Sequence, residues 1–347
     1  MQIRRAPPSH AACFLLSLMA LAACGAPNGP SPEAMTEPAT AQTSAAAPAM
    51  TGELSTAATR SDPGHSGQAL PAVFDCLRET GGVVVAAHRG GPLPGFAENG
   101  LETLQVNRAA GLSVFEVDVA SSRDGVLFLL HDRTLDRTTT GSGPVEERDW
   151  DLISTLQLVD NDGRPTGHPP PRLRDVLIWA RQAGAVIELD RKSSARFADI
   201  ISVVRETGAS DHVILITYSD DQAAEVARLA PDLMMTASAS SPEDVARLRA
   251  AGVSTDRLIA WTGTRDPDPD SWQILAEMGV EAAFGTLGRP GGRLDDTYLA
   301  DGDASEYQAL ADGGLVLLAT DAPREAAEVL RADDGALTRC RIGDPAP

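Results

Sequence analysis

Residues 114–119 read Val-Phe-Glu-Val-Asp-Val, and this stretch decides the fold. Its apolar residues indicate a buried strand. Because side chains of a strand alternate between two faces, Glu116 and Asp118 point the same way. Apolar runs that resemble strands also precede His88 and His131. Barrel enzymes keep their catalytic groups at strand ends, so these polar residues indicate a site at the rim of a barrel.

Seven further apolar segments of strand length follow the same pattern. The eight candidate strands lie near residues 83–87, 113–119, 185–190, 213–217, 233–237, 257–261, 281–284 and 315–319. Amphipathic helical patterns fill most of the intervals, and alternating strands and helices imply a parallel sheet. Eight units in about 260 residues predict an α/β fold, a (β/α)8 TIM barrel rather than a doubly wound sheet. Residues 150–171, rich in Asp, Gly and Pro, are expected to form an irregular excursion, either at the mouth of the site or as a surface loop.

The first 70 residues are expected to lie outside the barrel. Two early arginines and the apolar run of residues 11–23 have the charge and length of a secretory signal, and the run is too short to span a bilayer. Residues 21–24, Leu-Ala-Ala-Cys, resemble a bacterial lipoprotein box, which implies a signal peptide over residues 1–23 and a lipid on Cys24. The alternative is plain secretion. Gly25 after the cysteine favours an outer-membrane anchor facing the periplasm.

Composition divides the mature chain in two. Residues 24–70, rich in Ala, Pro, Thr and Ser, predict a disordered tether, and residues 71–347 are left as the barrel domain. The formal net charge of −20 argues against nucleic acid as a partner and favours small soluble substrates over anionic lipid surfaces. The sequence does not indicate an oligomeric state.

Cys76 and Cys340 are the two cysteines of the predicted barrel domain. In an oxidising compartment such residues often pair. Closure of a barrel brings its first and last elements together, so a disulfide between them is expected. Two buried apolar thiols are the alternative.

Two strands carry candidate metal ligands. Glu116 and Asp118 form a pair of hard oxygen ligands that suits Mg²⁺ or Ca²⁺, and the lack of a cysteine or dense histidine cluster argues against zinc. A structural ion pair with arginines is the alternative. On the strand near residues 185–190, the same alternation places Glu188, Asp190 and Lys192 on one face.

A series of short motifs runs in order through residues 83–140. The motifs are His88-Arg89-Gly90, Glu98-Asn99, Glu116-Val117-Asp118, Asp124-Gly125, His131-Asp132 and Leu135-Asp136-Arg137-Thr138-Thr139. Together they resemble the glycerophosphodiester phosphodiesterase family. Weaker similarity at residues 171–177, 261–262 and 319–323 extends the resemblance over roughly residues 80–332. The resemblance implies metal-dependent hydrolysis of glycerophosphodiesters to glycerol 3-phosphate and an alcohol.

The resemblance also implies roles for single residues. His88 and His131 would be the general acid and base, which imidazoles titrating near neutrality can serve as. Arg89 would bind the phosphate, unless it forms a salt bridge with Glu98 or Asp118. Glu98 itself is either a further ligand or a partner of the ligands.

The same resemblance implies a third metal ligand and a residue that contacts the alcohol part of the substrate. The family has Glu-x-Lys where this chain has Asp190-Arg191-Lys192, which makes Asp190 the third ligand beside Glu116 and Asp118, and Lys192 a phosphate contact. Aspartate is one methylene shorter than glutamate, so Glu188 is the alternative ligand. Trp261 is expected either to form an apolar wall over the alcohol part of the substrate or to fill the core.

One local expectation and two other functions stay open. Asn99 is expected to cap the helix that begins near Leu101, although Gly100 replaces the family's threonine. A phospholipase C or sphingomyelinase D type enzyme could act on intact lipid with the same barrel. A non-catalytic envelope lipoprotein is the remaining class, which the histidines and carboxylates argue against.

Overall fold

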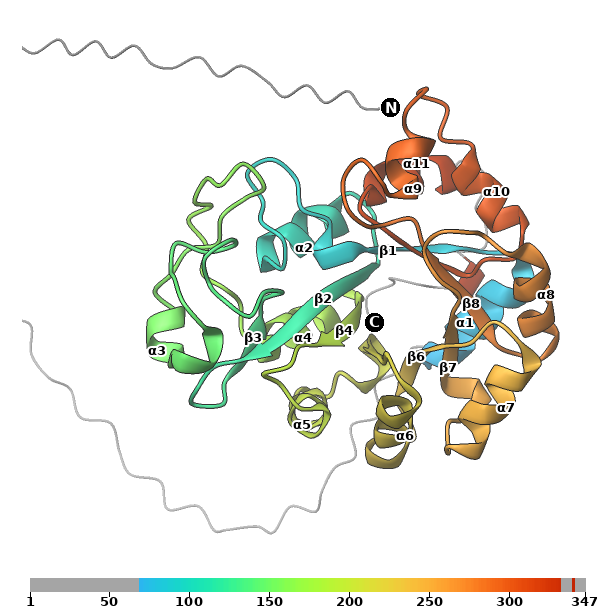
Figure 1. Cartoon of the computed structure of the whole chain (residues 1–347), viewed down its shortest axis with the longest axis horizontal. Helices are drawn as coiled ribbons and strands as arrows, with labels where there is room; N and C mark the ends of the chain where they lie inside the picture. The colour runs from blue at the N-terminus through green and yellow to red at the C-terminus, as the bar shows by residue number, and fades with distance from the viewer. Residues whose placement is uncertain (1–68, 332–338, 341–347) are drawn as a thin grey trace, which may run out of the picture. The chain divides into compact units, whose positions relative to one another are not determined.

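The computed structural model describes residues 69–331 and 339–340. Eight parallel strands pair in the order β1, β9, β8, β7, β6, β5, β4 and β2, and β2 pairs with β1 again, which closes a barrel (Figure 1). These strands are β1 (Val84–Ala87), β2 (Val114–Ser121), β4 (Val186–Arg191), β5 (Val213–Ile216), β6 (Met234–Ser238), β7 (Leu258–Trp261), β8 (Glu281–Gly285) and β9 (Leu317–Thr320). Each overlaps one predicted strand, so the predicted α/β TIM barrel is confirmed.

Helices follow the strands and cover the outside of the barrel. They are α2 (Leu101–Ala109), α4 (Leu173–Ala183), α5 (Phe197–Thr207), α6 (Asp220–Leu229), α7 (Pro242–Ala250), α8 (Pro269–Glu277), α9 (Leu294–Tyr298), α10 (Glu306–Asp312) and α11 (Pro323–Arg331). Short 3-10 turns lie at η1 (His88–Gly90), η2 (Val145–Glu147), η3 (Ser210–His212) and η4 (Thr255–Arg257). On α5, Phe197, Ile200 and Val204 recur at helical spacing and are buried in the core between helices and strands.

Helix α1 (Leu70–Thr80) precedes β1 and packs on the interior of the barrel. Its apolar face joins one buried cluster with inward-facing residues of the strands. Arg78 of α1 forms a salt bridge with Glu281, the first residue of β8, so α1 lies at the amino ends of the strands. Cys76 of α1 forms a disulfide with Cys340, and their Cα atoms are 5.5 Å apart.

The excursion after β2 is more ordered than the sequence indicated. The apolar run before His131 forms strand β3 (Leu127–Leu129), as expected, and pairs antiparallel with β2. Helix α3 (Trp150–Ile153) follows η2 and begins the segment that was expected to be irregular. A separate small core holds these pieces together, and it consists of Ala120, Phe128, Leu130, Leu135, Val145, Trp150 and Ile153. The rings of Phe128 and Trp150 pack with centroids 5.6 Å apart. The prediction of an irregular segment over residues 150–171 was therefore wrong at its start, because Trp150 anchors a helix.

The predicted signal peptide at residues 1–23, Cys24 and the tether up to residue 68 lie outside the described residues. Helix α1 begins at Leu70, the last residue of the predicted tether. Among the described helices, none is both long and apolar enough to cross a membrane.

Candidate active site

The acidic residues of β2 and β4 meet because the two strands pair in register. Glu116 lies opposite Glu188, and Asp118 lies opposite Asp190. Parallel pairing puts side chains of the same face next to each other at the carboxyl ends of the strands. Glu116, Asp118 and Asp190 are buried, and each offers a carboxylate oxygen within 4.8 Å of the other two.

This acidic triad consists of Glu116, Asp118 and Asp190, three buried carboxyl groups that lie close together. Burial raises the pKa of Glu116 well above its usual range, and the charges of Asp118 and Asp190 raise it further. Lys192 Nζ lies 2.5 Å from Asp118 Oδ1 and 2.7 Å from Asp190 Oδ2. Burial alone would lower the pKa of Lys192, but the two aspartate charges outweigh burial and raise it. Lys192 thus contacts two of the three carboxyl groups, and the three oxygens lie close enough together to hold a metal ion.

The donors of the triad fit a divalent cation. Oδ1 of Asp190 is buried and has no hydrogen-bond partner. An ionised oxygen that is buried without a partner costs free energy, which a bound cation would offset. A set of carboxylate oxygens suits Mg²⁺ or Ca²⁺ rather than a soft metal.

Glu188 lies outside the triad. It is buried in register with Glu116, two residues before Asp190 along β4. Burial raises the pKa of Glu188 to about 8. Of the two residues considered as third ligand, the structure therefore places Asp190 in the triad.

His88 lies on η1, directly after β1. Its Nδ1 is 2.7 Å from Oδ1 of Asp321, and its Nε2 is 4.0 Å from Oε2 of Glu116. Asp321 follows β9 and accepts hydrogen bonds from the Gly288 backbone and from Arg293. Burial acts to raise the pKa of Asp321, but its bonds to these partners and to His88 lower it to about 2. The ionised Asp321 accepts the Nδ1 proton of His88, and Nε2 then faces the triad.

His131 has an equivalent partner in the next residue. Its Nδ1 is 2.7 Å from Oδ1 of Asp132. Arg137 donates to both oxygens of Asp132 and forms a two-pronged contact with Glu98, at 2.8 Å for each bond. Hydrogen bonds from Arg137 and His131 lower the pKa of Asp132 well below its usual range, despite its partial burial. The backbone N–H of Leu130, the residue before His131, donates to the Asp118 carbonyl at 2.9 Å, which brings His131 to the end of β2 that carries the triad.

Arg89 contacts three acidic residues. Its backbone N–H donates to Oε2 of Glu116 at 2.7 Å, and its side chain lies 3.2 Å from Glu98 and 3.8 Å from Asp118. Arg89 therefore forms the salt bridge that was the alternative to a phosphate contact. Glu98 accepts hydrogen bonds from both Arg89 and Arg137. Nε of Arg89 is buried without a hydrogen-bond partner, and its 3.8 Å distance from Oδ2 of Asp118 is too long for one. Its backbone is left-handed, with φ 51°, which strains a residue with a side chain.

Asn99 does not cap helix α2, so that prediction was wrong. Gly100 is the N-cap residue, and it makes no side-chain cap bond. The amide of Asn99 instead pairs with Asp118, donating to Oδ2 at 2.7 Å and accepting from the backbone N–H at 2.9 Å. A buried carboxylate is a stronger hydrogen-bond acceptor than a neutral group, and it orients Asn99 toward the strand.

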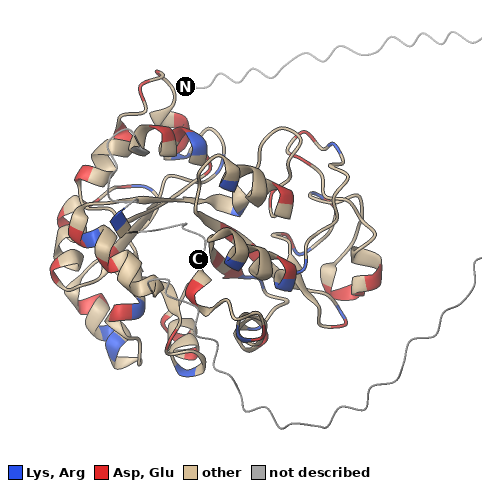
Figure 2. Ribbon diagram, turned by 180° about the vertical axis from the view of Figure 1, so that it is seen from behind, with Lys and Arg blue, Asp and Glu red and all other residues tan. Residues whose placement is uncertain are grey.

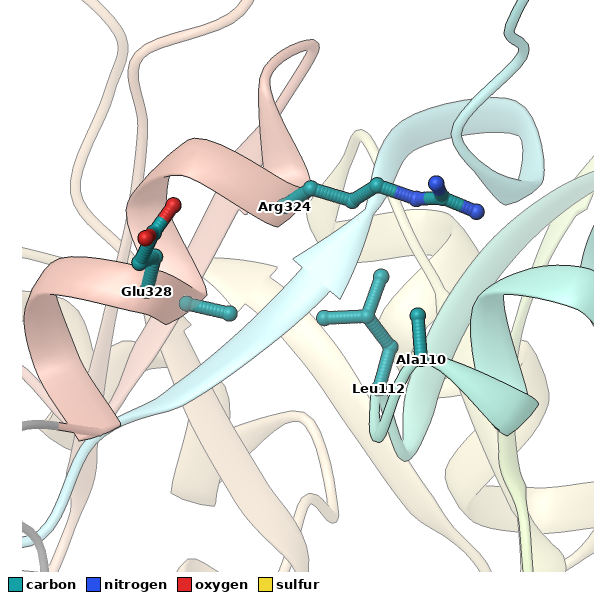
Figure 3. A pocket seen from close by; sticks show the side chains of 5 residues that line it. Ala110, Leu112, Arg324 and Glu328 are labelled. Carbon is teal, nitrogen blue, oxygen red and sulfur yellow. The ribbon is translucent and has the colours of Figure 1, made fainter.

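Helix α2 also fastens the loop that carries His88. The buried amide of Asn107 donates to the carbonyls of Gly90 and Gly91, each at 2.7 Å, and accepts from Arg324 Nε at 2.8 Å. Arg324 belongs to α11 and points across a pocket of about 310 Å³ between α11 and the turn after α2 (Figure 3). That pocket lies on the outer side of the barrel wall and contains no residue of the triad.

Two aromatic residues lie at the carboxyl ends of strands. Trp261 ends β7, is partly buried and packs on the barrel interior. A Cβ at Gly285 would lie 2.8 Å from its ring, so glycine is needed there to leave room. Tyr218 follows β5; its residue is 66% exposed, yet its hydroxyl donates to Oδ2 of Asp190 at 2.9 Å.

Arg137, Tyr218 and Asp321 were not assigned roles from the sequence. Arg137 and Asp321 did lie within quoted motifs, and Tyr218 follows a predicted strand directly. The strand-end rule could have selected Tyr218 and Asp321 as rim residues. The residues that Tyr218 and Asp321 contact could not be predicted in this way, because these contacts depend on which strands become neighbours in the barrel.

Comparison with known proteins agrees with this arrangement. Residues 88–196 match the model of the Glycerophosphoryl diester phosphodiesterase family. An uncharacterized Bacillus subtilis protein is 32% identical over 155 residues, 43% of this chain and 63% of that protein. The "Probable glycerophosphodiester phosphodiesterase 2" of Mycobacterium tuberculosis is 28% identical over 188 residues, 54% of this chain and 67% of its own length. The chain thus aligns with 63% to 67% of these two relatives.

A solved structure extends the match over the whole barrel. A glycerophosphoryl diester phosphodiesterase from Parabacteroides distasonis superposes with a TM-score of 0.63 at 25% identity, covering 72% of this chain and 86% of that one. The family match contains both histidines, the acidic triad and Lys192. Residues 88–196 of this chain thus match the glycerophosphoryl diester phosphodiesterase family, and its barrel shares the fold of a solved member of that family.

Proposed function

We propose that this protein hydrolyses glycerophosphodiesters to glycerol 3-phosphate and a free alcohol, and that it requires a divalent cation, Ca²⁺ or Mg²⁺. The observation that carries the proposal is the acidic triad beside two histidines that are each backed by an aspartate. Such a site can bind a phosphodiester, stabilise its negative charge and move two protons.

The acidic triad would hold the cation, which supplies Lewis acidity toward the phosphoryl oxygens when bound. Lys192 lies against two of the three carboxylates, and Arg89 lies beside Asp118. Their charges would stabilise the negative charge that develops on the phosphoryl group. Trp261 would form the apolar wall over the alcohol part of the substrate.

The two histidines would carry the protons. One imidazole takes the proton of the attacking oxygen through Nε2, and the other donates a proton to the leaving alkoxide. The attacking oxygen belongs either to a neighbouring hydroxyl of the glycerol, which gives a cyclic phosphate that water then opens, or to water itself. Asp321 and Asp132 hold the rings so that the same nitrogen of each faces the substrate.

Release of glycerol 3-phosphate by the purified protein tests the proposal. The substrates are glycerophosphocholine, glycerophosphoethanolamine and glycerophosphoglycerol, with Ca²⁺, Mg²⁺ or chelator, and with His131→Ala as the control. We expect release that needs both the cation and His131, with a loss of about 10²–10⁴-fold in the variant. No release from any of them by folded protein would reject the proposal, and hydrolysis of intact phospholipids instead would support the phospholipase alternative.

We further propose that a lipid on Cys24 anchors the protein to the outer membrane, facing the periplasm. The lipoprotein-like residues 21–24 and the low-complexity segment after them support this proposal. Metabolic labelling with a radioactive fatty acid tests it. Cys24→Ala should abolish the label and release the protein from the membrane fraction, whereas an unlabelled wild-type chain would favour plain secretion.

A further inference from the structure

Tyr218 is held firmly at the rim, although the residue is largely exposed. It follows β5 and precedes Ser219, which caps helix α6 by accepting from the Gln222 backbone. The backbone N–H of Tyr218 donates to the side chain of Gln222 at 2.9 Å. Thr217 bonds the Thr236 carbonyl of β6 through both its N–H and its hydroxyl. The backbone under Tyr218 is thus fixed on both sides.

The hydroxyl of Tyr218 makes the two oxygens of Asp190 unequal. Oδ2 accepts from Tyr218 Oη at 2.9 Å and from Lys192 Nζ at 2.7 Å. Oδ1 is buried and accepts from no group. The carboxylate torsion of aspartate has a broad energy profile, so hydrogen bonds decide its orientation. Two donors on Oδ2 therefore fix the carboxylate and leave Oδ1 as its oxygen without a donor.

The two donors would respond differently to a bound cation. The ammonium of Lys192 is repelled by a divalent cation beside Asp118 and Asp190, whereas the neutral hydroxyl of Tyr218 carries no such charge. Tyr218 is therefore the donor that keeps Asp190 oriented when the site is filled. Groups that orient ligands in this way commonly change metal affinity by 10–100-fold when they are removed.

We infer that Tyr218 is a positioning residue that presents Oδ1 of Asp190 to the divalent cation and so sets the affinity of the site for it. This inference rests on the proposed metal-dependent function. It assigns a role to a residue outside the family match, which ends at residue 196.

Tyr218→Phe tests the inference, because it removes the hydroxyl and keeps the ring. Binding of Ca²⁺ and of Mg²⁺ is measured by isothermal titration calorimetry on metal-stripped full-length protein, without substrate. We expect binding to weaken by about 10–100-fold. Tyr298→Phe is the control. Tyr298 packs on Tyr307 with ring centroids 5.3 Å apart, and its substitution should leave the affinity unchanged.

The dependence of the hydrolysis rate on cation concentration distinguishes a positioning role of Tyr218 from a general effect on the structure. In Tyr218→Phe, the cation concentration for half-maximal rate should rise by the same factor as the dissociation constant, and kcat should return to near the wild-type value at saturating cation. The unfolding temperature in chelator should stay close to that of the wild type, because Tyr218 is largely exposed and Lys192 still donates to Oδ2 of Asp190 in the variant.

Equal cation affinity in Tyr218→Phe and wild type would overturn the inference, as would a loss of kcat that saturating cation does not restore. A wild-type protein that binds no divalent cation would overturn it together with the metal dependence. Unequal affinities in a protein that does not hydrolyse glycerophosphodiesters would uphold the inference and reject the proposed function.

Discussion

At the scale of single residues, the orientation of His88 depends on Asp321. The Asp321 carboxylate accepts the Nδ1 proton and is held by Gly288 and Arg293. Asp321→Asn removes the charge and allows the wrong ring nitrogen to face the substrate. We expect kcat to fall by about 10²–10⁴-fold, the range of acid–base catalysis, in an assay at saturating cation.

Asp296→Asn is the matched control for that substitution. Asp296 also pairs with Arg293, at 3.0 Å, but no bond joins it to His88. Its loss should leave kcat within about threefold of the wild type, since it touches neither the ring nor the triad. If Asp321→Asn retained wild-type kcat, or bound the cation more weakly, the assigned role of Asp321 would be wrong.

Glu188 gives a prediction about pH. Its pKa is raised to about 8 by burial, so the folded state keeps its proton in a range where the unfolded state has lost it. The folded chain binds more protons there, and stability falls as pH rises from the ordinary glutamate value of about 4.3 toward 8. Glu188→Gln cannot ionise and should lack this loss.

Urea unfolding of both proteins in chelator at pH 5 and pH 8 measures the effect. We expect the difference in the free energy of unfolding, Glu188→Gln minus wild type, to be larger at pH 8 than at pH 5 by several kcal/mol. The limit is about 1.4 kcal/mol for each pH unit crossed. The chelator matters because a bound cation would itself favour the ionised carboxylate. A difference between the two proteins that is the same at both pH values would contradict the raised pKa.

The sequence predicted the positions of side chains that follow from the alternation of residues along a strand. It did not predict contacts that form only when distant segments meet in the closed barrel. Glu116 and Asp118 lie on one face because they are two residues apart on a strand. Arg137 reaches Glu98 across 39 residues, and Asp321 reaches His88 across 233 residues. No local pattern relates such pairs, because their proximity requires the completed barrel.

At the scale of elements, η1 keeps its strained shape because α2 and α11 hold it. Asn107 bonds the carbonyls of Gly90 and Gly91, and a Cβ at Gly91 would lie 2.8 Å from Pro323 of α11. Asn107→Ala leaves both carbonyls without this partner. We expect the free energy of unfolding to fall by about 1–3 kcal/mol and kcat to fall at least about tenfold as His88 loses its position.

Urea unfolding and saturating-substrate assays measure the two effects. Asn161→Ala, at an exposed residue of the excursion after β2, should change neither stability nor kcat. Loss of stability with unchanged kcat would show that Asn107 supports the fold but does not position His88.

The barrel strands were predictable because each is a short buried apolar run flanked by an amphipathic helix. The excursion between β2 and α4 was not, because its small core combines residues from β2, β3, η2 and α3 that share no period. Asn99 shows the same limit at a helix start. Its sequence context favoured a cap, and the buried Asp118 on a neighbouring strand decided otherwise.

At the scale of the whole molecule, the excess of acidic residues affects which ions and substrates approach the site. The chain has 49 acidic and 29 basic residues, and Figure 2 shows them interspersed along the outer helices. The chain's acidic excess adds to the negative charge of a site that is itself built from carboxylates. Such a field favours the approach of cations over polyanions, in agreement with a divalent cation and a substrate of low net charge.

The disulfide Cys76–Cys340 acts on stability and not on chemistry. It links residues 264 positions apart, and it joins α1 at the amino ends of the strands, whereas the triad lies toward the carboxyl ends. A crosslink over so long a loop reduces the conformational freedom of the unfolded chain. The double variant Cys76→Ser with Cys340→Ser should therefore lower the free energy of unfolding by about 2–5 kcal/mol.

Its kcat at 25 °C should stay within about twofold of the wild type, since no group of the triad or its partners touches α1. Urea unfolding with and without reductant provides the control, because reductant should destabilise the wild type to the level of the double variant and leave the variant unchanged. A parallel loss of kcat would mean that closure of the amino end of the barrel is transmitted to the acidic triad through the strands. The disulfide would then be part of the catalytic framework as well as a crosslink.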